Sequence, residues 1–264
     1  MKNINWSELG FGYFKTDYNV RCEYKDGKWG ELYATEDVNM NIHMASTCLH
    51  YGQEVFEGLK AFRGADGKVR LFRVEENAKR MINSGEYLKM AVPSVELFTK
   101  ACIEAVKLNA DYIPPYGSGA SLYLRPMLIG VGPQVGVKPS ADYLFAVFVT
   151  PVGPYYKDGF NCIKVIIDYD HDRAAPKGTG HVKVGGNYAA SLDSGEIAHQ
   201  KGFASVIFLD PATKQYIDEC SAANFFGIRD GKYITPDSHS VLPSITNKSL
   251  RQIAEDLGLK VEQR

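Results

Sequence analysis

One lysine in this chain is surrounded by residues that suit covalent chemistry. Lys183 lies in the segment from Gly178 to Tyr188, which places two glycines before the lysine and two after it. A lysine that forms a Schiff base with a planar carbonyl compound needs close backbone approach, and glycines allow it because they lack a Cβ atom. Glycine clusters also occur in ordinary loops, and most lysines are solvated surface charges. Lys183 is therefore a candidate Schiff-base lysine whose assignment depends on the rest of the chain.

A candidate phosphate site accompanies this lysine. The segment from Leu242 to Asn247 predicts a helix N-terminus, whose backbone N–H groups bind anions, and we expect Thr246 to cap the helix and donate its hydroxyl to the anion. Arg80, in a predicted helix over residues 74–90, is a candidate guanidinium for the same phosphate. Taken alone, an ordinary capped helix and a solvent-facing arginine explain these patterns equally well.

Glu219 is a candidate partner for a ring nitrogen. A pyridine cofactor withdraws electrons only while its ring nitrogen is protonated, so a carboxylate must be held against that nitrogen. Glu219 ends an apolar segment and precedes small residues, Cys220 to Asn224, that leave room for a flat ring. The alternative is a strand-end glutamate in solvent.

The elements that must position these residues form two groups, with a break near Pro151, Gly153 and Pro154. We predict a smaller N-terminal α/β domain over residues 1–150, a linker over 151–160 and a larger C-terminal domain over 161–264. The predicted strands cover 59–62, 69–72, 121–125, 143–149, 162–167, 205–209, 215–219 and a hairpin over 224–234, and the predicted helices cover 74–90, 94–108, 187–200 and 246–257.

Composition excludes several classes of function. The net charge of −1 and the absence of a basic run give no reason to expect nucleic acid or an anionic membrane as a partner. The five cysteines and six histidines are scattered, which argues against a disulfide framework and against a metal site. The N-terminus lacks the apolar core of a signal peptide and no apolar run is long enough to span a bilayer, so we expect a cytoplasmic protein.

Several segments, in this order along the chain, resemble the branched-chain amino acid aminotransferases, which are fold-type IV enzymes that use pyridoxal 5′-phosphate (PLP). The resemblance runs almost from end to end, and the order of the segments is far more specific than any one of them. These segments are Leu49 to Phe62, Phe72 to Met81, Ser121 to Pro126, Gly178 to Tyr188, Glu219 to Phe225 and Leu242 to Thr246.

The resemblance implies a role for each candidate residue. Lys183 would carry PLP and, once freed by the substrate, would move the substrate's α-proton, a role that requires a neutral amine. By the same resemblance, Tyr188 and Glu219 contact the cofactor ring. The other residues implied at the cofactor, three of them at its phosphate, are Arg80, Asn224, Ile245 and Thr246.

The resemblance also implies a substrate pocket and a homodimer. An aromatic wall would accept the leucine, isoleucine or valine side chain, although the core is the default place for Phe56 and Tyr123. Val135 and Val137 would reach the active site of the neighbouring subunit. The residues implied at the substrate are Tyr51, Phe56, Tyr123, Arg125, Val135, Val137 and Ala222.

The sequence departs from the family pattern in three places. Family members normally continue beyond the position of Arg264, through a Gly-Thr turn that binds the cofactor phosphate and the substrate carboxylate, so the C-terminal domain is expected to be truncated here. Ala222 stands where some relatives have threonine, and His181 where small residues are common.

We therefore expect an α/β (α+β) fold-type IV PLP aminotransferase, with two domains and the active site between them. The expected reaction is reversible transfer of the amino group from L-leucine, L-isoleucine or L-valine to 2-oxoglutarate, giving branched-chain 2-oxo acids and L-glutamate. The alternatives are another fold-type IV enzyme, either a D-amino acid transaminase or an aminodeoxychorismate lyase, and a truncated PLP-binding paralogue without full activity.

Overall fold

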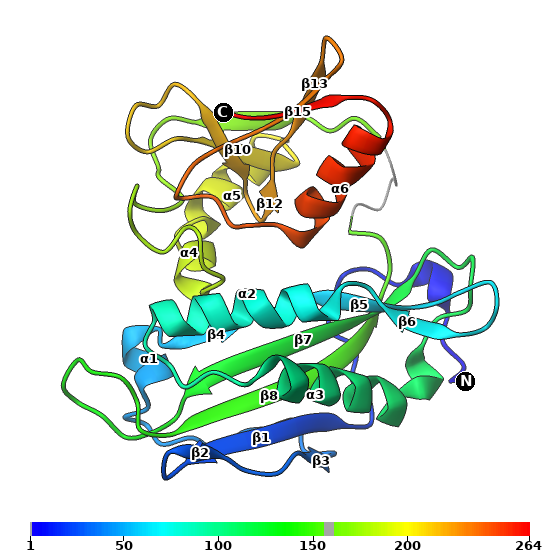
Figure 1. Ribbon diagram of the computed structural model, residues 1–264, viewed down its shortest axis with the longest axis vertical. Coiled ribbons are helices and arrows are strands. Elements are labelled where there is room, and N and C mark those ends of the chain that lie inside the picture. The colour runs from blue at the N-terminus through cyan, green and yellow to red at the C-terminus, as the bar shows by residue number, and fades with distance from the viewer. Residues whose placement is uncertain (1, 156–160) are drawn as a thin grey trace. The chain divides into compact units, whose positions relative to one another are not determined.

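The computed structural model describes residues 2–155 and 161–264, which fall into two compact units, Met1–Asn161 and Cys162–Arg264. Each unit is described by itself below (Figure 1). Strand β8 runs to Val152, two residues into the segment 151–160 predicted as a linker. Residues 156–160 of that segment lie outside the described residues.

Unit 1 is built on an antiparallel sheet whose strands run in the order β2-β1-β8-β7-β5-β6, with β3 paired to β1 and β4 paired to β7. The longest pairing joins β7 and β8, from Ser121 opposite Val152 to Gly130 opposite Tyr143. The predicted hairpin of β5 and β6 is confirmed, with Ala61 opposite Leu71. The strands are β1 (Asn19–Lys25), β2 (Lys28–Trp29), β3 (Tyr33–Thr35), β4 (Glu54–Phe56), β5 (Leu59–Arg63), β6 (Val69–Leu71), β7 (Ser121–Gly130) and β8 (Tyr143–Val152).

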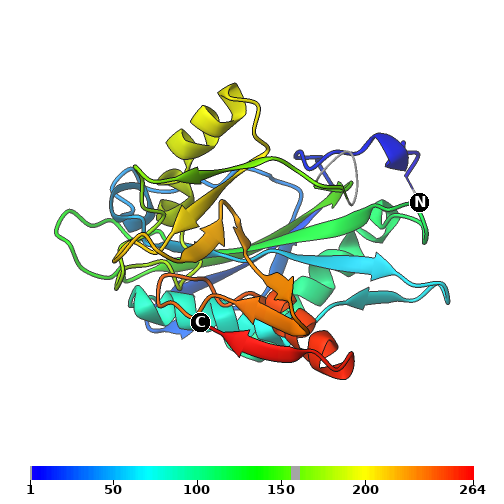
Figure 2. The same ribbon diagram turned by 90° about the horizontal axis from the view of Figure 1, so that it is seen from above.

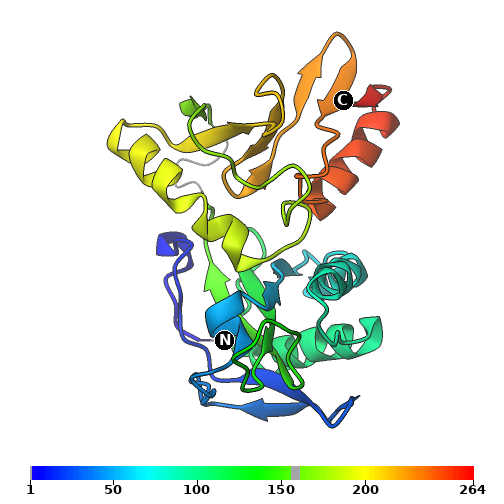
Figure 3. The same cartoon turned by 90° about the vertical axis from the view of Figure 1, so that its left-hand side faces the viewer.

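Two helices cover one face of this sheet, as Figure 3 shows. They are α2 (Val74–Tyr87) and α3 (Val95–Leu108), and Ser94 caps α3 by accepting the Leu97 N–H at 3.1 Å. The buried ring of Phe98 on α3 stacks on Phe145 of β8 at 5.8 Å, which anchors the helix to the centre of the sheet. Shorter helical segments are η1 (Trp6–Glu8), α1 (Thr47–Tyr51) and η2 (Ala110–Tyr112).

Unit 2 contains two small sheets. In the first, β9 and β10 are parallel while β10, β11 and β12 pair antiparallel. In the second, β14 pairs antiparallel with β13 through a turn at Asp230 and Gly231, both of positive φ, and parallel with β15. The strands are β9 (Val165–Asp168), β10 (Ser205–Leu209), β11 (Ile217–Cys220), β12 (Ala223–Asn224), β13 (Gly227–Arg229), β14 (Lys232–Thr235) and β15 (Lys260–Gln263).

The helices of unit 2 are α4 (Gly185–Ala189), α5 (Leu192–Gln200) and α6 (Ile245–Asp256), with α5 and α6 on opposite sides of the strands (Figures 2 and 3). The prediction of one helix over 187–200 is wrong, because the chain breaks between α4 and α5. Ser191 lies at the break and donates its hydroxyl to the Tyr188 carbonyl at 2.8 Å, a local bond that competes with the helix.

The predicted cap of α6 is also wrong. Ser244, not Thr246, accepts the Asn247 N–H at 3.1 Å, and Thr246 lies one residue inside the helix, where its side chain is exposed. At the other end the prediction holds, since Gly258 has a positive φ of 79° just beyond the helix. No helix in the described part of the chain is long and apolar enough to cross a membrane.

Candidate active site

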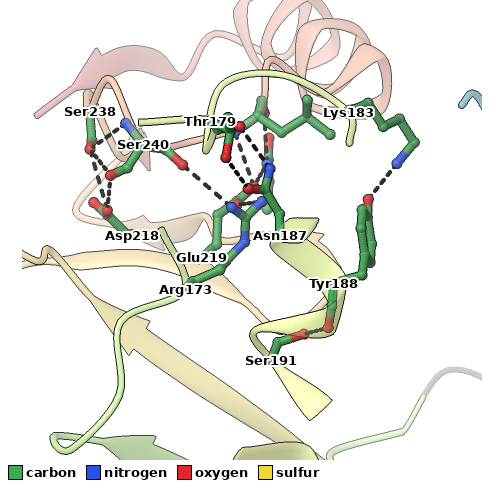
Figure 4. Close-up of polar contacts among 12 residues, drawn as sticks. Arg173, Thr179, Lys183, Asn187, Tyr188, Ser191, Asp218, Glu219, Ser238 and Ser240 are labelled. Carbon is green, nitrogen blue, oxygen red and sulfur yellow. Dashed lines mark hydrogen bonds and ion pairs between the residues drawn. The ribbon is translucent and has the colours of Figure 1, made fainter. Parts of the chain in front are cut away.

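Lys183 and Tyr188 are in hydrogen-bond contact within unit 2. The lysine Nζ donates to the tyrosine hydroxyl at 2.6 Å and lies 5.0 Å from the centre of its ring (Figure 4). Lys183 stands between the buried side chains of Val182 and Val184, which fix the backbone while the lysine itself stays half-buried. The sequence thus places a lysine on a short, well-packed segment and orients it towards a tyrosine hydroxyl.

The loop that carries Lys183 is packed tightly on the segment before α6. A Cβ atom on Gly180 would collide with the backbone of Ser240, so this glycine is required for the close approach. Ser240 is itself buried, and its hydroxyl donates to Asp218 at 2.5 Å. This explains one glycine of the motif by packing rather than by clearance for a ligand.

Glu219 is almost completely buried at the end of β11, so the solvent-facing alternative is wrong. One carboxylate oxygen accepts from Asn224 at 2.6 Å and from the Leu242 N–H at 3.3 Å, and the other pairs with the Arg173 guanidinium (Figure 4). Burial raises the pKa of Glu219 to about 7, although Arg173 and the Asn224 amide oppose this shift by favouring the ionised form. The carboxylate can therefore exchange a proton near neutral pH.

This raised pKa predicts a pH dependence of stability. Between its ordinary value of 4.5 and about 7, the folded state binds more protons at Glu219 than the unfolded state does. The contribution of Glu219 to stability is then complete below pH 4.5 and is lost as the pH rises through 7, at up to about 1.4 kcal/mol per pH unit. Urea unfolding at pH 5 to 8, without added ligands, should show a shallower decline for Glu219→Gln than for the unaltered protein.

Glu255→Gln is the control for this measurement, because it removes an exposed carboxyl from α6 of the same unit. It should keep the decline of the unaltered protein. Equal pH dependence for Glu219→Gln and Glu255→Gln would contradict the assignment of the shift to Glu219.

A network of amides continues from Glu219 to the start of α6. Asn224 donates to the Leu242 carbonyl at 2.9 Å, and its side-chain oxygen accepts from Asn247 at 3.4 Å. These hydrogen bonds connect Glu219 and Asn224 to the start of α6, where Ile245 and Thr246 lie. All four residues are predicted at the cofactor. Ala222 is exposed in the turn between β11 and β12.

Arg80 belongs to unit 1, and its environment differs from the solvated helix face that was the alternative. Its side chain is 13% exposed and forms a two-point ion pair with Glu57, with Nε–Oε1 at 2.7 Å and Nη2–Oε2 at 2.8 Å. Asn77, three residues earlier on α2, donates to the same carboxylate at 2.7 Å. Glu57 has no exposed surface, so the orientation of Arg80 is fixed by a buried anion.

Three predicted substrate residues meet on strands of unit 1. The Arg125 guanidinium lies over the rings of Phe56, at 4.7 Å, and Tyr123, at 5.3 Å, and it donates to the Tyr123 hydroxyl at 3.0 Å. Gly58 leaves space for that hydroxyl, since a Cβ atom there would collide with it. The Nε atom of Arg125 is buried and has no hydrogen-bond partner within residues 2–155 and 161–264. The cluster therefore combines an aromatic wall with a cation.

The remaining predicted residues lie near a loop after β7. The Tyr51 hydroxyl donates to the Val135 carbonyl, and the side chains of Val135 and Val137 are 86% and 85% exposed. Such exposure is unusual for valines and is confined here to the segment between β7 and β8. No group of three potential ligands for a metal ion occurs among the residues that the structure describes.

Sequence reasoning missed three residues that organise these groups: Glu57, Arg173 and Asn187. Glu57 had a detectable signal, because it is a charged residue between the apolar Val55 and Phe56 and the predicted strand that begins at Leu59. Arg173 and Asn187 had none, since their partners depend on how the loop before α4 folds back on itself.

Comparison with known proteins identifies the family of this chain. The family model Amino-transferase class IV matches residues 54–264. The branched-chain-amino-acid aminotransferase of Haemophilus influenzae is 53% identical over 98% of this chain and 78% of its own length. The crystal structure of the Escherichia coli branched-chain amino acid aminotransferase has a TM-score of 0.76 at 27% identity, over 95% of this chain and 78% of that one.

A further solved structure, the T.th. branched-chain amino acid aminotransferase with pyridoxamine 5′-phosphate, has a TM-score of 0.72 at 27% identity, over 92% of this chain and 76% of that one. The family model covers well over half of the chain, and the curated relative is matched over more than two thirds of its length. The chain belongs to the class IV aminotransferases and, within that class, to the branched-chain amino acid aminotransferases.

Proposed function

We propose that this chain is a PLP-dependent enzyme that transfers the amino group of L-leucine, L-isoleucine or L-valine to 2-oxoglutarate, giving the branched-chain 2-oxo acid and L-glutamate. The observation that carries the proposal is the 2.6 Å contact between Lys183 and Tyr188 within a chain 53% identical to an enzyme of that name. A lysine amine held by a phenol hydroxyl suits both covalent attachment and proton transfer.

The residues present fit PLP. When bound, PLP supplies an electron-withdrawing ring that stabilises negative charge at the substrate's α-carbon. The buried Glu219 carboxylate, paired with Arg173, suits a protonated ring nitrogen, and the Tyr188 hydroxyl suits the ring oxygen. The N-terminus of α6, with Ile245 and Thr246 in its first turn, and the Arg80 guanidinium suit the phosphate.

Each residue of the proposed site then has its own role. The Lys183 amine would accept the proton from the substrate's α-carbon and deliver it to the carbon that receives the amino group, while the Tyr188 hydroxyl holds that amine in place. Asn224 keeps the Glu219 carboxylate oriented by a 2.6 Å hydrogen bond. Arg173 stabilises the charged form of that carboxylate, so that it stays a hydrogen-bond acceptor for a protonated ring nitrogen.

Phe56, Tyr123 and Arg125 are the proposed substrate residues. The two rings offer apolar surface to a branched side chain, and the buried, unsatisfied Arg125 Nε supports a role for this residue in binding a carboxylate of the acid partner. Tyr51, whose hydroxyl donates to the Val135 carbonyl, and Ala222 are the remaining proposed substrate residues.

Steady-state assays with 2-oxoglutarate as acceptor test the function directly. L-leucine, L-isoleucine and L-valine should each yield glutamate, whereas D-alanine as donor and aminodeoxychorismate as a substrate for lysis should not react. Activity on D-alanine or aminodeoxychorismate without activity on leucine would identify another fold-type IV enzyme. Retention of PLP without any turnover would identify a binding protein instead.

We also propose a homodimer in which Val135 and Val137 reach the neighbouring subunit. Their exposure of 86% and 85% supports this, because solvated valines are unfavourable unless a partner covers them. Sedimentation should give twice the 29.3 kDa mass of one chain.

Val137→Asp should raise the KM for leucine by about tenfold. Val69→Asp, which alters another exposed valine of unit 1, should leave the KM unchanged.

A monomer in sedimentation, or equal KM values for the two variants, would contradict the dimer proposal.

We further propose a cytoplasmic location. The cysteines support this, because disulfides are rare in that compartment and the five cysteines are free thiols in the structure: Cys22, Cys48, Cys102, Cys162 and Cys220.

A further inference from the structure

The Asn187 side chain forms three hydrogen bonds to the loop before Lys183. Asn187, on α4, is 5% exposed and donates its side-chain N–H groups to the Thr179 carbonyl at 2.7 Å and the Val182 carbonyl at 2.9 Å. Its side-chain oxygen accepts from the Thr179 hydroxyl at 2.7 Å (Figure 4). Both N–H donors and the oxygen of this amide are therefore hydrogen-bonded, and all the partners lie within the four residues that immediately precede Lys183.

These bonds fix the backbone directly before Lys183. The Thr179 carbonyl also accepts the Val182 N–H at 3.1 Å, so a backbone turn and the Asn187 amide both fix the backbone that enters Lys183. On α4, Asn187 is followed directly by Tyr188, the partner of the lysine Nζ at 2.6 Å. One short helix thus fixes both the backbone before the lysine and the hydroxyl that its amine contacts.

We propose that Asn187 is a positioning residue, which sets the approach of Lys183 to Tyr188 by pinning the Thr179–Val182 turn. This inference rests on the proposed function, because it assigns Asn187 to the placement of the lysine that would carry PLP. It concerns geometry only: Asn187 acts through the loop, and its hydrogen-bonding groups are occupied by Thr179 and Val182. Displacement of a reacting group by about 1 Å lowers turnover by about 100-fold.

The isosteric change Asn187→Asp removes the two donors and keeps the acceptor for the Thr179 hydroxyl. A carboxylate oxygen would then face the Thr179 and Val182 carbonyls, and the turn should open. Thr179→Val is the milder variant, because it removes only the bond from the hydroxyl and leaves both amide donors in use. The effect should be graded from Thr179→Val to Asn187→Asp.

Asn109 in unit 1 supplies a closely matched control. It is 1% exposed, donates to the Tyr18 and Ala105 carbonyls at 3.0 and 2.8 Å, and accepts the Tyr18 N–H at 3.1 Å. Asn109→Asp breaks the same number of bonds by the same chemistry in a segment that carries no lysine of the proposed site. It should lower stability as Asn187→Asp does, without the specific effects below.

The first readout needs no activity. Hydrogen exchange, followed by mass spectrometry on the purified holoenzyme, should be faster by about tenfold or more in peptides covering 179–184 for Asn187→Asp, and unchanged there for Asn109→Asp. The second readout is the visible absorption band of the lysine-bound cofactor, which should shift or weaken for Asn187→Asp alone. The third is kinetic: kcat should fall by about 10- to 100-fold, with less change in the KM for leucine.

Unchanged exchange in 179–184 together with an unchanged absorption band for Asn187→Asp would overturn the inference, as would equal effects of Asn109→Asp. Failure of the proposed function is a separate result, since the unaltered protein would then form no glutamate from L-leucine, L-isoleucine or L-valine. Exchange in the loop still tests the pinning in that case. If Asn187→Asp does not fold, the same comparison of Thr179→Val with the unaltered protein decides the question.

Discussion

Replacing Lys183 with alanine should abolish covalent attachment of the cofactor and lower kcat/KM for leucine by about 1,000-fold or more, because one side chain supplies both the nucleophile and the proton carrier. Borohydride reduction followed by mass spectrometry should find no cofactor adduct in the variant. In the unaltered protein the adduct should lie on the peptide that contains Lys183.

Two further variants separate this effect from a loss of side-chain bulk or a disturbed loop. Lys183→Arg keeps a long basic side chain beside Tyr188 but cannot form the same linkage, so it should be as inactive as Lys183→Ala. Lys177→Ala removes an exposed lysine from the same loop and should keep both the adduct and the activity. Transamination by Lys183→Ala, or a reducible adduct on another residue, would refute the assignment.

The Lys183–Tyr188 pair was within reach of the sequence because the two residues are close along the chain, although the role proposed for the lysine depended on the rest of the chain. The glycines around the lysine and the tyrosine five residues later are adjacent in sequence, and the structure brings the lysine Nζ and the tyrosine hydroxyl to 2.6 Å. Hydrophobic patterning also predicted β10 with the bounds that the structure gives, and the β5–β6 hairpin. Strands with strong apolar patterns and turns with glycine need little tertiary information.

The supporting residues could not be predicted in this way. Asn187 and Thr179 are eight residues apart, and nothing in their types shows that the chain turns back between them. A hydrogen bond from the Ser191 hydroxyl to the Tyr188 carbonyl lies at the break between α4 and α5, and Ser244 rather than Thr246 caps α6 although both types are good caps. In each case several residues compete for one hydrogen bond, and tertiary packing decides between them.

The pairing of Glu57 with Arg80 could not be predicted either, because it joins residues that are farther apart in the sequence. A buried carboxylate and a helix arginine are 23 residues apart, and either one alone is typical of a solvated surface. Their pairing turns Arg80 from an exposed charge into an oriented, nearly buried one. Glu57 thus orients the guanidinium that is proposed for the phosphate.

Removing the charge of Glu57 is the second change with a large expected effect. Glu57→Gln keeps the shape of the side chain but removes the negative charge that faces the Arg80 guanidinium, which is only 13% exposed. Breaking a buried ion pair on one side lowers the free energy of unfolding by about 3 to 5 kcal/mol. Urea unfolding should show that loss, and the holoenzyme should release PLP more readily because Arg80 is no longer held in place.

An exposed ion pair in the same unit gives the control. Arg70 pairs with both oxygens of Asp66, at 2.8 and 2.7 Å, in the same two-point geometry but with about half of each side chain exposed to water. Asp66→Asn is isosteric in the same sense and should change the free energy of unfolding only slightly, because solvent screens this pair. Equal losses for Glu57→Gln and Asp66→Asn would show that burial of the Glu57 pair has no special effect.

A double replacement separates stability from cofactor binding. Glu57→Leu with Arg80→Met exchanges the buried pair for apolar side chains of similar size, and such exchanges are often neutral or stabilising. The double variant should therefore unfold at a higher urea concentration than Glu57→Gln, yet it should bind PLP no better, since the guanidinium proposed for the phosphate is gone. Recovery of both properties would show that Arg80 serves only the fold, whereas recovery of stability alone is the result expected if Glu57 positions Arg80 for the phosphate.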